Sequence, residues 1–251
     1  MLTRQRKQYL MDLLRQEGRL VAKELSHTLA VSEDTIRRDL REMAKEGLLL
    51  RVHGGALPAS PAIADFTVRE YLVPEEKIAI GRAAALRVQP GQVVFIDGGT
   101  TCLQLARHLP LDLKATVITH SPSIAMALVD HSDIEVIMLG GRLFRHSLVG
   151  VGATTLEAIG RVRADLYFMG VCSVHPTAGL STGDFEEAVI KRALCHAAAE
   201  TIVLATSEKL TTASPYQVVE LASISAIVLL ASTSPALREP YEKQGISLYL
   251  A

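Results

Sequence analysis

Residues 19–46, RLVAKELSHTLAVSEDTIRRDLREMAKE, predict two short amphipathic helices joined by a tight turn. Apolar side chains recur every three or four positions in both segments, as they do on one face of a helix. They are Val21, Leu25 and Leu29 in the first segment and Ile36, Leu40 and Met43 in the second. Ser32 stands where an N-cap belongs, and the acidic residues after it suit the positive end of the second helix. The two apolar faces are expected to pack together as a helix-turn-helix.

The second helix leaves polar side chains free once its apolar face is buried. These side chains are Thr35, Arg37, Arg38 and Arg41. Groups of this kind can contact phosphates or base edges in a major groove of DNA. A capped surface helix whose arginines are merely solvated is the plain alternative.

The flanking segments favour the DNA-binding interpretation. Residues 4–17 predict a third amphipathic helix that ends at Gly18, and residues 48–52 predict a strand followed by a Gly-Gly turn. Three helices and a β-hairpin make a winged helix-turn-helix. The candidate DNA contacts are then Ser32, Thr35, Arg37, Arg38, Arg41, Arg51 and His53.

Composition limits the class of protein. The chain has 251 residues, of which 49% are hydrophobic, enough for one small and one larger domain. It contains no apolar run of about 18 residues and no signal peptide, so we expect a globular, cytoplasmic protein. Its three cysteines are widely spaced and form no metal-ligand or disulfide pattern. We therefore expect no metal and no cofactor.

Charge is divided unevenly along the chain. The net charge is −1, yet residues 1–57 carry 11 basic and 8 acidic side chains, which leaves the remainder acidic. The basic part is the part with the helix-turn-helix motif. Because its surplus is modest and phosphate neutralisation supplies much of the affinity for DNA, we expect a homodimer or homotetramer that presents several such domains.

The rest of the chain predicts a linker and an α/β domain. Residues 58–74 contain three prolines and several small residues, as linkers do. Residues 75–251 alternate short, continuously apolar strands with helices, which indicates a Rossmann-like, mostly parallel sheet covered on both faces. The predicted strands are residues 93–97, 115–119, 135–139, 166–170, 201–205, 226–230 and 246–250. The predicted helices are near residues 75–88, 102–109, 122–129, 154–159, 185–199 and 235–244.

Small and polar residues follow several of these strands, where ligands bind in open parallel sheets. The sequence DGGTT at residues 97–101 leads directly into a helix and offers amides, hydroxyls and a positive helix end, as a phosphate cradle does. The candidate effector contacts are Asp97, Gly98, Gly99, Thr100 and Thr101, joined by Thr119, Ser121, Gly140 and Gly141 from the ends of the next strands. Asp97 is expected to hold the loop or to accept hydrogen bonds from sugar hydroxyls.

Plain turns between strands and helices are the alternative for each of these positions taken alone. No strand is followed by GxGxxG, and the sequence has no P-loop. A phosphorylated small molecule is therefore favoured over a nucleotide.

Two motifs carry a resemblance to a known family. TIRRDL at residues 35–40, followed by RVHGGAL at residues 51–57, resembles the DeoR family of bacterial transcription regulators. The resemblance continues through DGGTT, GLST at residues 179–182 and SEKL at residues 207–210. It implies a second domain that is similar in fold to ribose-5-phosphate isomerase and binds sugar phosphates as effectors. By that resemblance Thr100, Thr101, Ser121 and Lys209 become candidate effector contacts.

The sequence departs from the family pattern at two places. Cys172-Ser173 stands where the family commonly has Asp-Gly, and Thr206 stands where Asp is usual. Isomerases of this kind need an acid–base carboxylate near the carbon that loses its proton. The loss of the first carboxylate therefore speaks against enzymatic activity.

These observations predict a DNA-binding transcriptional regulator, a repressor rather than an enzyme, whose operator binding is controlled by a phosphorylated sugar or related metabolite. Its expected partners are double-stranded operator DNA and the effector, with no membrane. Two alternatives remain open: an isomerase-like enzyme acting on sugar phosphates, and a DNA binder with a vestigial sensor domain.

Overall fold

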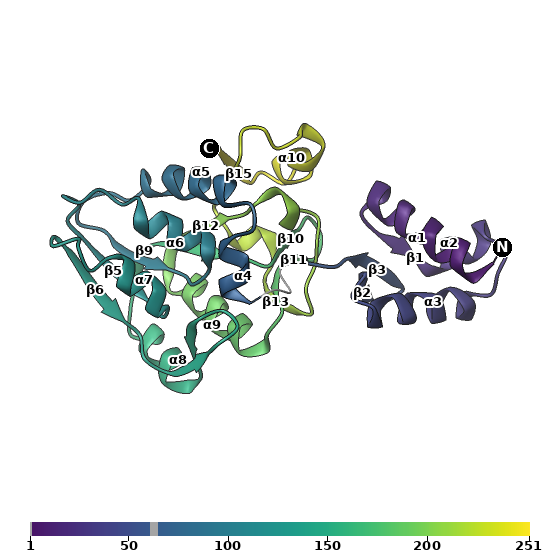
Figure 1. Ribbon diagram of the computed structural model, residues 1–251, viewed down its shortest axis with the longest axis horizontal. Helices are drawn as coiled ribbons and strands as arrows, with labels where there is room; N and C mark the ends of the chain where they lie inside the picture. The colour runs from purple at the N-terminus through teal and green to yellow at the C-terminus, as the bar shows by residue number, and fades with distance from the viewer. Residues whose placement is uncertain (1, 61–64) are drawn as a thin grey trace.

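The computed structural model describes residues 2–60 and 65–251, which form two bodies arranged along one axis (Figure 1). The smaller body, here called the head, comprises residues 2–58. The larger body, here called the sheet domain, comprises residues 65–251. Residues 61–64, which belong to the predicted linker, lie outside the described residues.

The head is the predicted winged helix-turn-helix. Its elements are α1 (Thr3–Glu17), β1 (Leu20–Val21), α2 (Ala22–Thr28), α3 (Glu33–Lys45), β2 (Leu49–Val52) and β3 (Gly55–Pro58). The wing is an antiparallel sheet in the order β1-β3-β2. Leu10, Leu25, Ile36, Leu40 and Met43 are buried in one core, so the helix faces predicted from their spacing do pack together.

One residue of that pattern was assigned to the wrong element. Val21 does not lie on α2; it pairs with Gly55 in the wing, and its neighbour Leu20 is buried in the core instead. The helix begins one residue later, at Ala22. A strand of two residues is too short to show a periodicity, so the helical pattern in the sequence continues into it without a visible break.

The larger domain confirms the predicted α/β architecture. Its main sheet has seven parallel strands in the order β15-β14-β12-β9-β4-β5-β6. The strands are β4 (Val93–Ile96), β5 (Ala115–Thr119), β6 (Ile134–Met138), β9 (Ala164–Gly170), β12 (Ala198–Leu204), β14 (Ala226–Leu229) and β15 (Ser247–Leu250).

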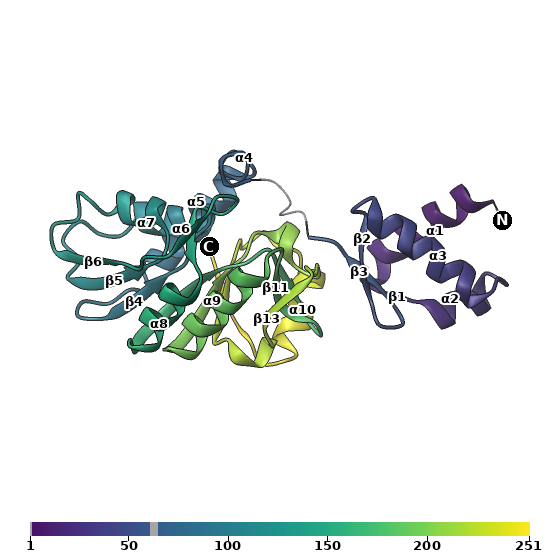
Figure 2. The same cartoon turned by 90° about the horizontal axis from the view of Figure 1, so that it is seen from below.

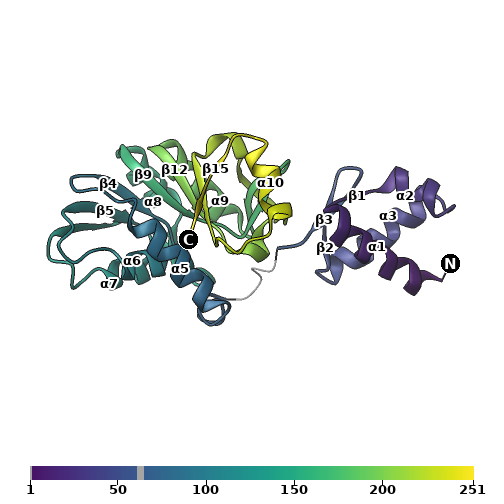
Figure 3. The same cartoon turned by 90° about the horizontal axis from the view of Figure 1, so that it is seen from above.

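Helices cover both faces of this sheet (Figure 2). One face carries α4 (Phe66–Glu70), α5 (Pro74–Ala85), α6 (Thr100–Arg107) and α7 (Pro122–Ala127). The other carries α8 (Ala153–Gly160), α9 (Phe185–His196) and α10 (Pro235–Glu242). The C-terminus lies beside α5, where Arg87 stacks 3.8 Å from the centre of the Tyr249 ring (Figure 3).

The sequence did not predict the shorter strands or every helix end. The hairpin of β7 (Arg142–Phe144) and β8 (Val149–Val151), and a sheet of β10 (Ser173–His175), β11 (Gly179–Thr182) and β13 (Tyr216–Val219), are additions. Short 3-10 helices lie at Ser207–Lys209 and Leu221–Ser223. Helix α9 ends at His196 rather than residue 199, because the chain enters β12 at Ala198.

The strand order contains a single reversal of direction that positions a site. From β4 the chain adds β5 and then β6 on one side, and β9 then returns to the opposite side of β4. The connection that follows β4 therefore crosses one face of the sheet, and the connection that follows β9 crosses the other. Open α/β sheets bind ligands in the crevice that forms at such a point.

The segment that follows the head is attached to the sheet domain. Pro58 and Ser60 hydrogen-bond through their backbones to Ala213, and Phe66 is buried against the core that contains α5 and α6. Among the described residues, no helix is both long enough and apolar enough to cross a membrane.

Candidate functional site

Asp97 lies at the carboxyl end of β4 and is the centre of a buried polar network. Its carboxylate accepts hydrogen bonds from His120 Nε2 at 2.9 Å, the Tyr167 hydroxyl at 2.9 Å and Lys191 Nζ at 2.5 Å. The backbone N–H groups of Gly98 and Gly170 donate to it as well. Asp97 therefore ties the end of β9 to the loop that follows β4, and its oxygens are occupied by protein donors.

The opposite charges in this network stabilise one another's ionised forms. Burial by itself would raise the pKa of Asp97, but Lys191 and the hydrogen bond from His120 bring that pKa well below the ordinary carboxylate range. Burial would likewise lower the pKa of Lys191, and Asp97 instead raises it. The two groups form an ion pair with side chains no more than 5% exposed.

The loop after Asp97 is shaped by close packing. A Cβ atom added to Gly98 would lie 2.1 Å from Val149 Cγ1, and one added to Gly170 would lie 2.6 Å from the carbonyl oxygen of Gly98. Gly99 has φ +110°, which favours glycine, and it is the N-cap of α6. The loop therefore lies at the N-terminus of α6, as expected, and its use as a phosphate cradle stays a prediction.

A pocket opens in front of this loop, at the point where the strand order reverses. It consists of a narrow cavity of about 30 Å³ and a wider one of about 230 Å³, which share Arg69, Thr100 and Lys209; we call the two together the switch-point pocket. Five of the predicted effector contacts line it, and they are Gly98, Gly99, Thr100, Thr101 and Lys209.

Basic side chains from separate parts of the chain meet at the switch-point pocket. They are Arg69, Lys77, Lys191 and Lys209. Burial and the nearby charge of Lys209 lower the pKa of Lys77 to about 8, and burial also lowers the pKa of Lys209. Burial is the main cause of both shifts, and a neighbouring cation adds to each, so a bound anion would favour the charged forms of both lysines.

Five predicted contacts lie outside the lining of the pocket: Asp97, described above, and four from the ends of the next strands. The Thr119 hydroxyl donates to the Ile96 carbonyl at 2.7 Å, and the Ser121 hydroxyl donates to the Leu148 carbonyl at 3.2 Å. Gly140 accepts a hydrogen bond from the Thr155 hydroxyl, against which Gly141 is also packed. Each has a role in the fold of neighbouring loops, so their contact with a ligand stays a prediction.

The pocket also contains residues that sequence reasoning did not assign to it. The unassigned lining residues include Arg69, Ser147, Cys172, Glu187 and Lys191. Lys191 had a visible signal, since its spacing from Ala188 and Leu194 places it on the buried face of α9. Arg69 had none, because it belongs to the segment taken as linker. Cys172 was noted as a departure and lines the pocket, whereas Thr206 is fully buried and donates to Glu208 at 2.7 Å.

The predicted DNA contacts lie on the surface of the head. Ser32 caps α3 by accepting a hydrogen bond from the Thr35 amide at 3.2 Å, as predicted. Arg37, Arg38 and Arg41 on α3 are exposed, and so are Arg51 and His53 in the wing. Arg37 pairs with Glu33 at 2.7 Å, and a surface pair of this kind is weak enough for a phosphate to replace it.

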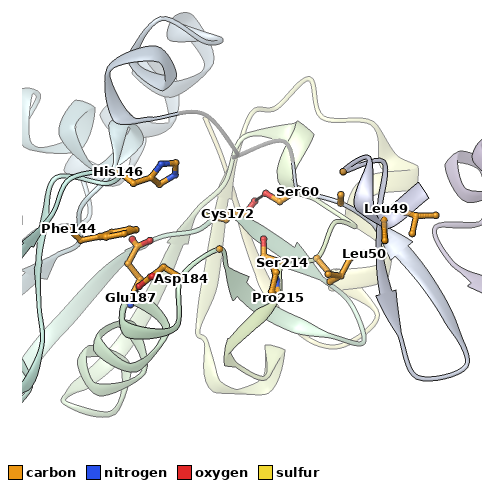
Figure 4. A pocket seen from close by; sticks show the side chains of 15 residues that line it. Leu49, Leu50, Ser60, Phe144, His146, Cys172, Asp184, Glu187, Ser214 and Pro215 are labelled. Carbon is orange, nitrogen blue, oxygen red and sulfur yellow. Dashed lines mark hydrogen bonds between the residues drawn. The ribbon is translucent and has the colours of Figure 1, made fainter. Parts of the chain in front are cut away.

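A second, larger cavity of about 540 Å³ lies between the head and the sheet domain. Leu49 and Leu50 of β2 line it on one side, and Asp184, Glu187 and Ser214 line it on the other (Figure 4). Among the described residues that line it are two carboxylates and no lysine or arginine, whereas four cations line the switch-point pocket beside Glu187 and Glu208. The switch-point pocket therefore suits an anion better, although it is the smaller of the two.

A DNA-binding head and an α/β domain with a pocket for an anion define a ligand-responsive transcription regulator. The family model of the DeoR-like helix-turn-helix domain matches residues 6–61, and that of the DeoR C-terminal sensor domain matches residues 73–229. The chain belongs to the DeoR family of transcriptional regulators.

Curated relatives match most of the chain. The HTH-type transcriptional regulator GlpR of Haloferax volcanii is 34% identical over 250 residues, which is 99% of this chain and 98% of that protein. The HTH-type transcriptional repressor GlcR of Bacillus subtilis is 31% identical and covers 95% of this chain and 93% of its own. The glycerol-3-phosphate regulon repressor of Escherichia coli is 34% identical over 76% of each chain.

One solved structure has a weak similarity to part of this chain. Ribose 5-phosphate isomerase A of Methanocaldococcus jannaschii covers 54% of this chain and 54% of its own, with 19% identity and a TM-score of 0.40. The family assignment does not depend on that likeness.

Proposed function

We propose that this regulator is a repressor that binds operator DNA through α3 and the wing, and that a phosphorylated small metabolite in the switch-point pocket changes its affinity for DNA. The observation that carries the proposal is the pocket itself. Lys191, Lys209 and Arg69 meet there around a glycine loop at the N-terminus of α6. Phosphate groups favour such a combination of fixed amides and cations.

The size of the pocket supports a small ligand. Its wider cavity of about 230 Å³ is below the range of about 300–1,000 Å³ that is typical of sites for drug-sized molecules. Glycerol 3-phosphate, which names the regulon of one relative, and sugar phosphates of five or six carbons are the compounds to test first. The narrow cavity would hold the phosphate beside Thr100 and Thr101, and the wider cavity would hold the carbon chain.

We propose that the site binds its ligand without turning it over. Asp97 is occupied by His120, Tyr167 and Lys191, so it cannot act as a general base. Glu187 is the remaining carboxylate of the narrow cavity. Assays for isomerisation of pentose and hexose phosphates test this point: turnover that is lost in Glu187→Ala or Lys209→Ala would make the protein an enzyme.

Operator binding is the first measurement. The full-length protein is titrated against fragments of its own and neighbouring promoters at about 100 mM salt, beside the double variant Arg37→Ala/Arg38→Ala. We expect one fragment to bind about 10³-fold more tightly than the others, and the double variant to lose that preference. Arg161→Ala/Arg163→Ala removes the same charge from exposed positions of the sheet domain and should bind normally.

Two results would contradict the proposal. Uniform weak binding that is unchanged in the Arg37→Ala/Arg38→Ala variant would remove α3 as the recognition helix. If glycerol 3-phosphate and sugar phosphates bind at saturation without changing operator affinity, control by an effector fails, because a ligand shifts an equilibrium only through different affinities for its two states. The same titrations at several protein concentrations test the proposed homodimer or homotetramer.

A further inference from the structure

Arg69 is incompletely paired although it lies in the wall of the switch-point pocket. Its Nε atom is buried and has no hydrogen-bond partner among the described residues. One terminal nitrogen donates to the His146 carbonyl and to the Ser147 hydroxyl, both at 3.3 Å, which is long for an arginine. A guanidinium group has five donors in a planar fork that matches a phosphate. Arg69 therefore has unused donor capacity beside a cavity that its side chain lines.

The short helix that carries Arg69 is fastened at its C-terminal end. Lys77 Nζ donates to the carbonyl oxygens of Arg69 and Leu72, the latter at 2.6 Å. Phe66 at the start of α4 is buried, and its amide donates to the His146 carbonyl at 2.9 Å. The backbone at Arg69 is therefore held in place, so its side chain is presented to the pocket from a fixed position.

Residues 58–60, at the end of the wing, are also fastened to the lining of this pocket. The Ser60 hydroxyl donates to the carbonyl of Cys172 at 2.8 Å, and Cys172 lines the narrow cavity. Residues 58–60 also form parallel backbone contacts with Ala213. We call residues 58–60 and 65–72 together the connector. It is attached to the sheet domain at Cys172 and at Arg69, on two sides of one pocket.

We infer that Arg69 binds the anionic group of the effector, and that the connector carries the occupancy of the pocket to the head through the contact between Ser60 and Cys172. This inference rests on the proposed function and adds to it the residue and the path. The effector bridges the Gly98–Gly99 loop and Arg69. The cavity between them holds about 30 Å³, so the walls must separate to admit a phosphate, and both attachment points of the connector are in those walls.

Pro58 and Ser60 hydrogen-bond to the sheet domain, and the wing strand β3 ends at Pro58, the first connector residue. A displacement of Cys172 is thereby passed through Ser60 to the end of the wing. Energetic coupling of two sites requires an element of this kind whose position both sites influence.

The test uses the full-length protein, with glycerol 3-phosphate, ribose 5-phosphate, glucose 6-phosphate and inorganic phosphate as probes. Affinity is measured by calorimetry, and the change in operator affinity is measured at saturating probe. We expect Arg69→Ala to weaken the best probe by at least about tenfold while operator binding without probe stays normal. Arg69→Lys keeps the charge but loses the fork, and we expect partial recovery. Arg82→Ala, an exposed residue of α5, is the matched control.

A second variant separates binding from transmission. Ser60→Ala removes the hydrogen bond to Cys172 and leaves the pocket lining intact, so we expect unchanged affinity for the probe and a reduced operator response. Arg69→Ala that binds the probe within twofold of the wild type would overturn the role of Arg69. A full response in Ser60→Ala would overturn the path. If the wild type binds no probe while still binding its operator, the proposed effector site falls, and the inference falls with it.

Discussion

A buried pair of a carboxylate and a cation occurs in each domain, and the two pairs serve different purposes. In the head, the Arg6 guanidinium contacts both carboxylate oxygens of Asp39, which joins α1 to α3. In the sheet domain, Lys191 joins α9 to Asp97 at the end of β4. The pair in the head lies in the core, away from the exposed arginines of α3. The pair in the sheet domain is part of the pocket.

This difference shows how the two domains divide stability and function. The head can change the exposed side chains that are predicted to contact DNA without disturbing what holds it together. The sheet domain has no such separation, because Lys191 lines the pocket and Asp97 fixes the loop that forms it. Substitutions in the pocket are therefore expected to affect folding and ligand binding together, and substitutions of the exposed side chains of α3 are expected to affect binding alone.

The largest effect is expected from the buried pairs. Asp97→Asn leaves Lys191 buried without its counter-ion, and Asp39→Asn does the same to Arg6; each should cost about 3–5 kcal/mol of unfolding free energy. Unfolding in denaturant measures the loss of stability. Operator binding then reports whether the head is folded, and probe binding reports the same for the sheet domain. We expect Asp97→Asn to abolish the response to the probe while the head still binds DNA, and Asp39→Asn to abolish DNA binding while the probe still binds. Loss of both activities in both variants would show that the domains do not fold separately.

The dependence of stability on pH tests the pair of Asp97 and Lys191. The pKa of Asp97 is lower in the folded protein than in the unfolded chain, so its contribution is complete above the unfolded value of about 3.9 and is lost as the pH falls through the folded value. The wild type should therefore lose stability in strong acid, and Asp97→Asn should lack this part of the dependence.

An intermediate effect is expected from the glycine loop. Gly98→Ala places a methyl group against Val149, which is itself 1% exposed, and overpacking of this kind costs about 1–3 kcal/mol. We expect the affinity for phosphorylated probes to fall by about tenfold. Gly160→Ala at the end of α8 meets no atom within 4 Å and should leave probe affinity unchanged. Equal effects of the two substitutions would argue against a close-packed cradle.

The smallest effect is expected from the helix caps. Ser32→Ala removes the cap of α3, and Asp184→Ala removes the cap of α9, where the side chain accepts from the Glu187 amide at 2.9 Å. Each should lower the unfolding free energy by about 1 kcal/mol. Only Ser32→Ala should also weaken operator binding, because α3 carries the predicted DNA contacts. A Ser32→Ala variant that binds the operator normally would place the contacts elsewhere on the head.

The sequence predicted the head almost completely because its information is local. Helix periodicity, the Ser32 cap and the Gly-Gly turn of the wing each involve residues only a few positions apart. The buried pair of Arg6 and Asp39 was not predicted, because 33 positions separate the two residues and both look like surface residues of amphipathic helices.

Only the part of the pocket that one short segment of the chain forms was predictable from local sequence. The loop at residues 97–101 was recognisable from its composition, and Lys209 came from the family resemblance. Lys191 and Arg69 reach the same place from α9 and α4, and strand order decides that they meet. The order of strands in a parallel sheet is set by long-range packing, which no local pattern records. The same limit explains why Thr119 and Gly140, after neighbouring strands, were expected at the pocket and lie outside its lining.

The position of β9 in the middle of the sheet has a consequence for synthesis on the ribosome. Strand β4 lies between β5 and β9, and its second neighbour exists only once residues 164–170 have been made. Contacts within the head span fewer than 60 residues, so the head can fold while the sheet is still incomplete. Chains that are still being translated, or that end early, would then contain a finished DNA-binding domain before the pocket that is proposed to control it. Rapid completion of the second domain therefore matters for regulation as well as for yield.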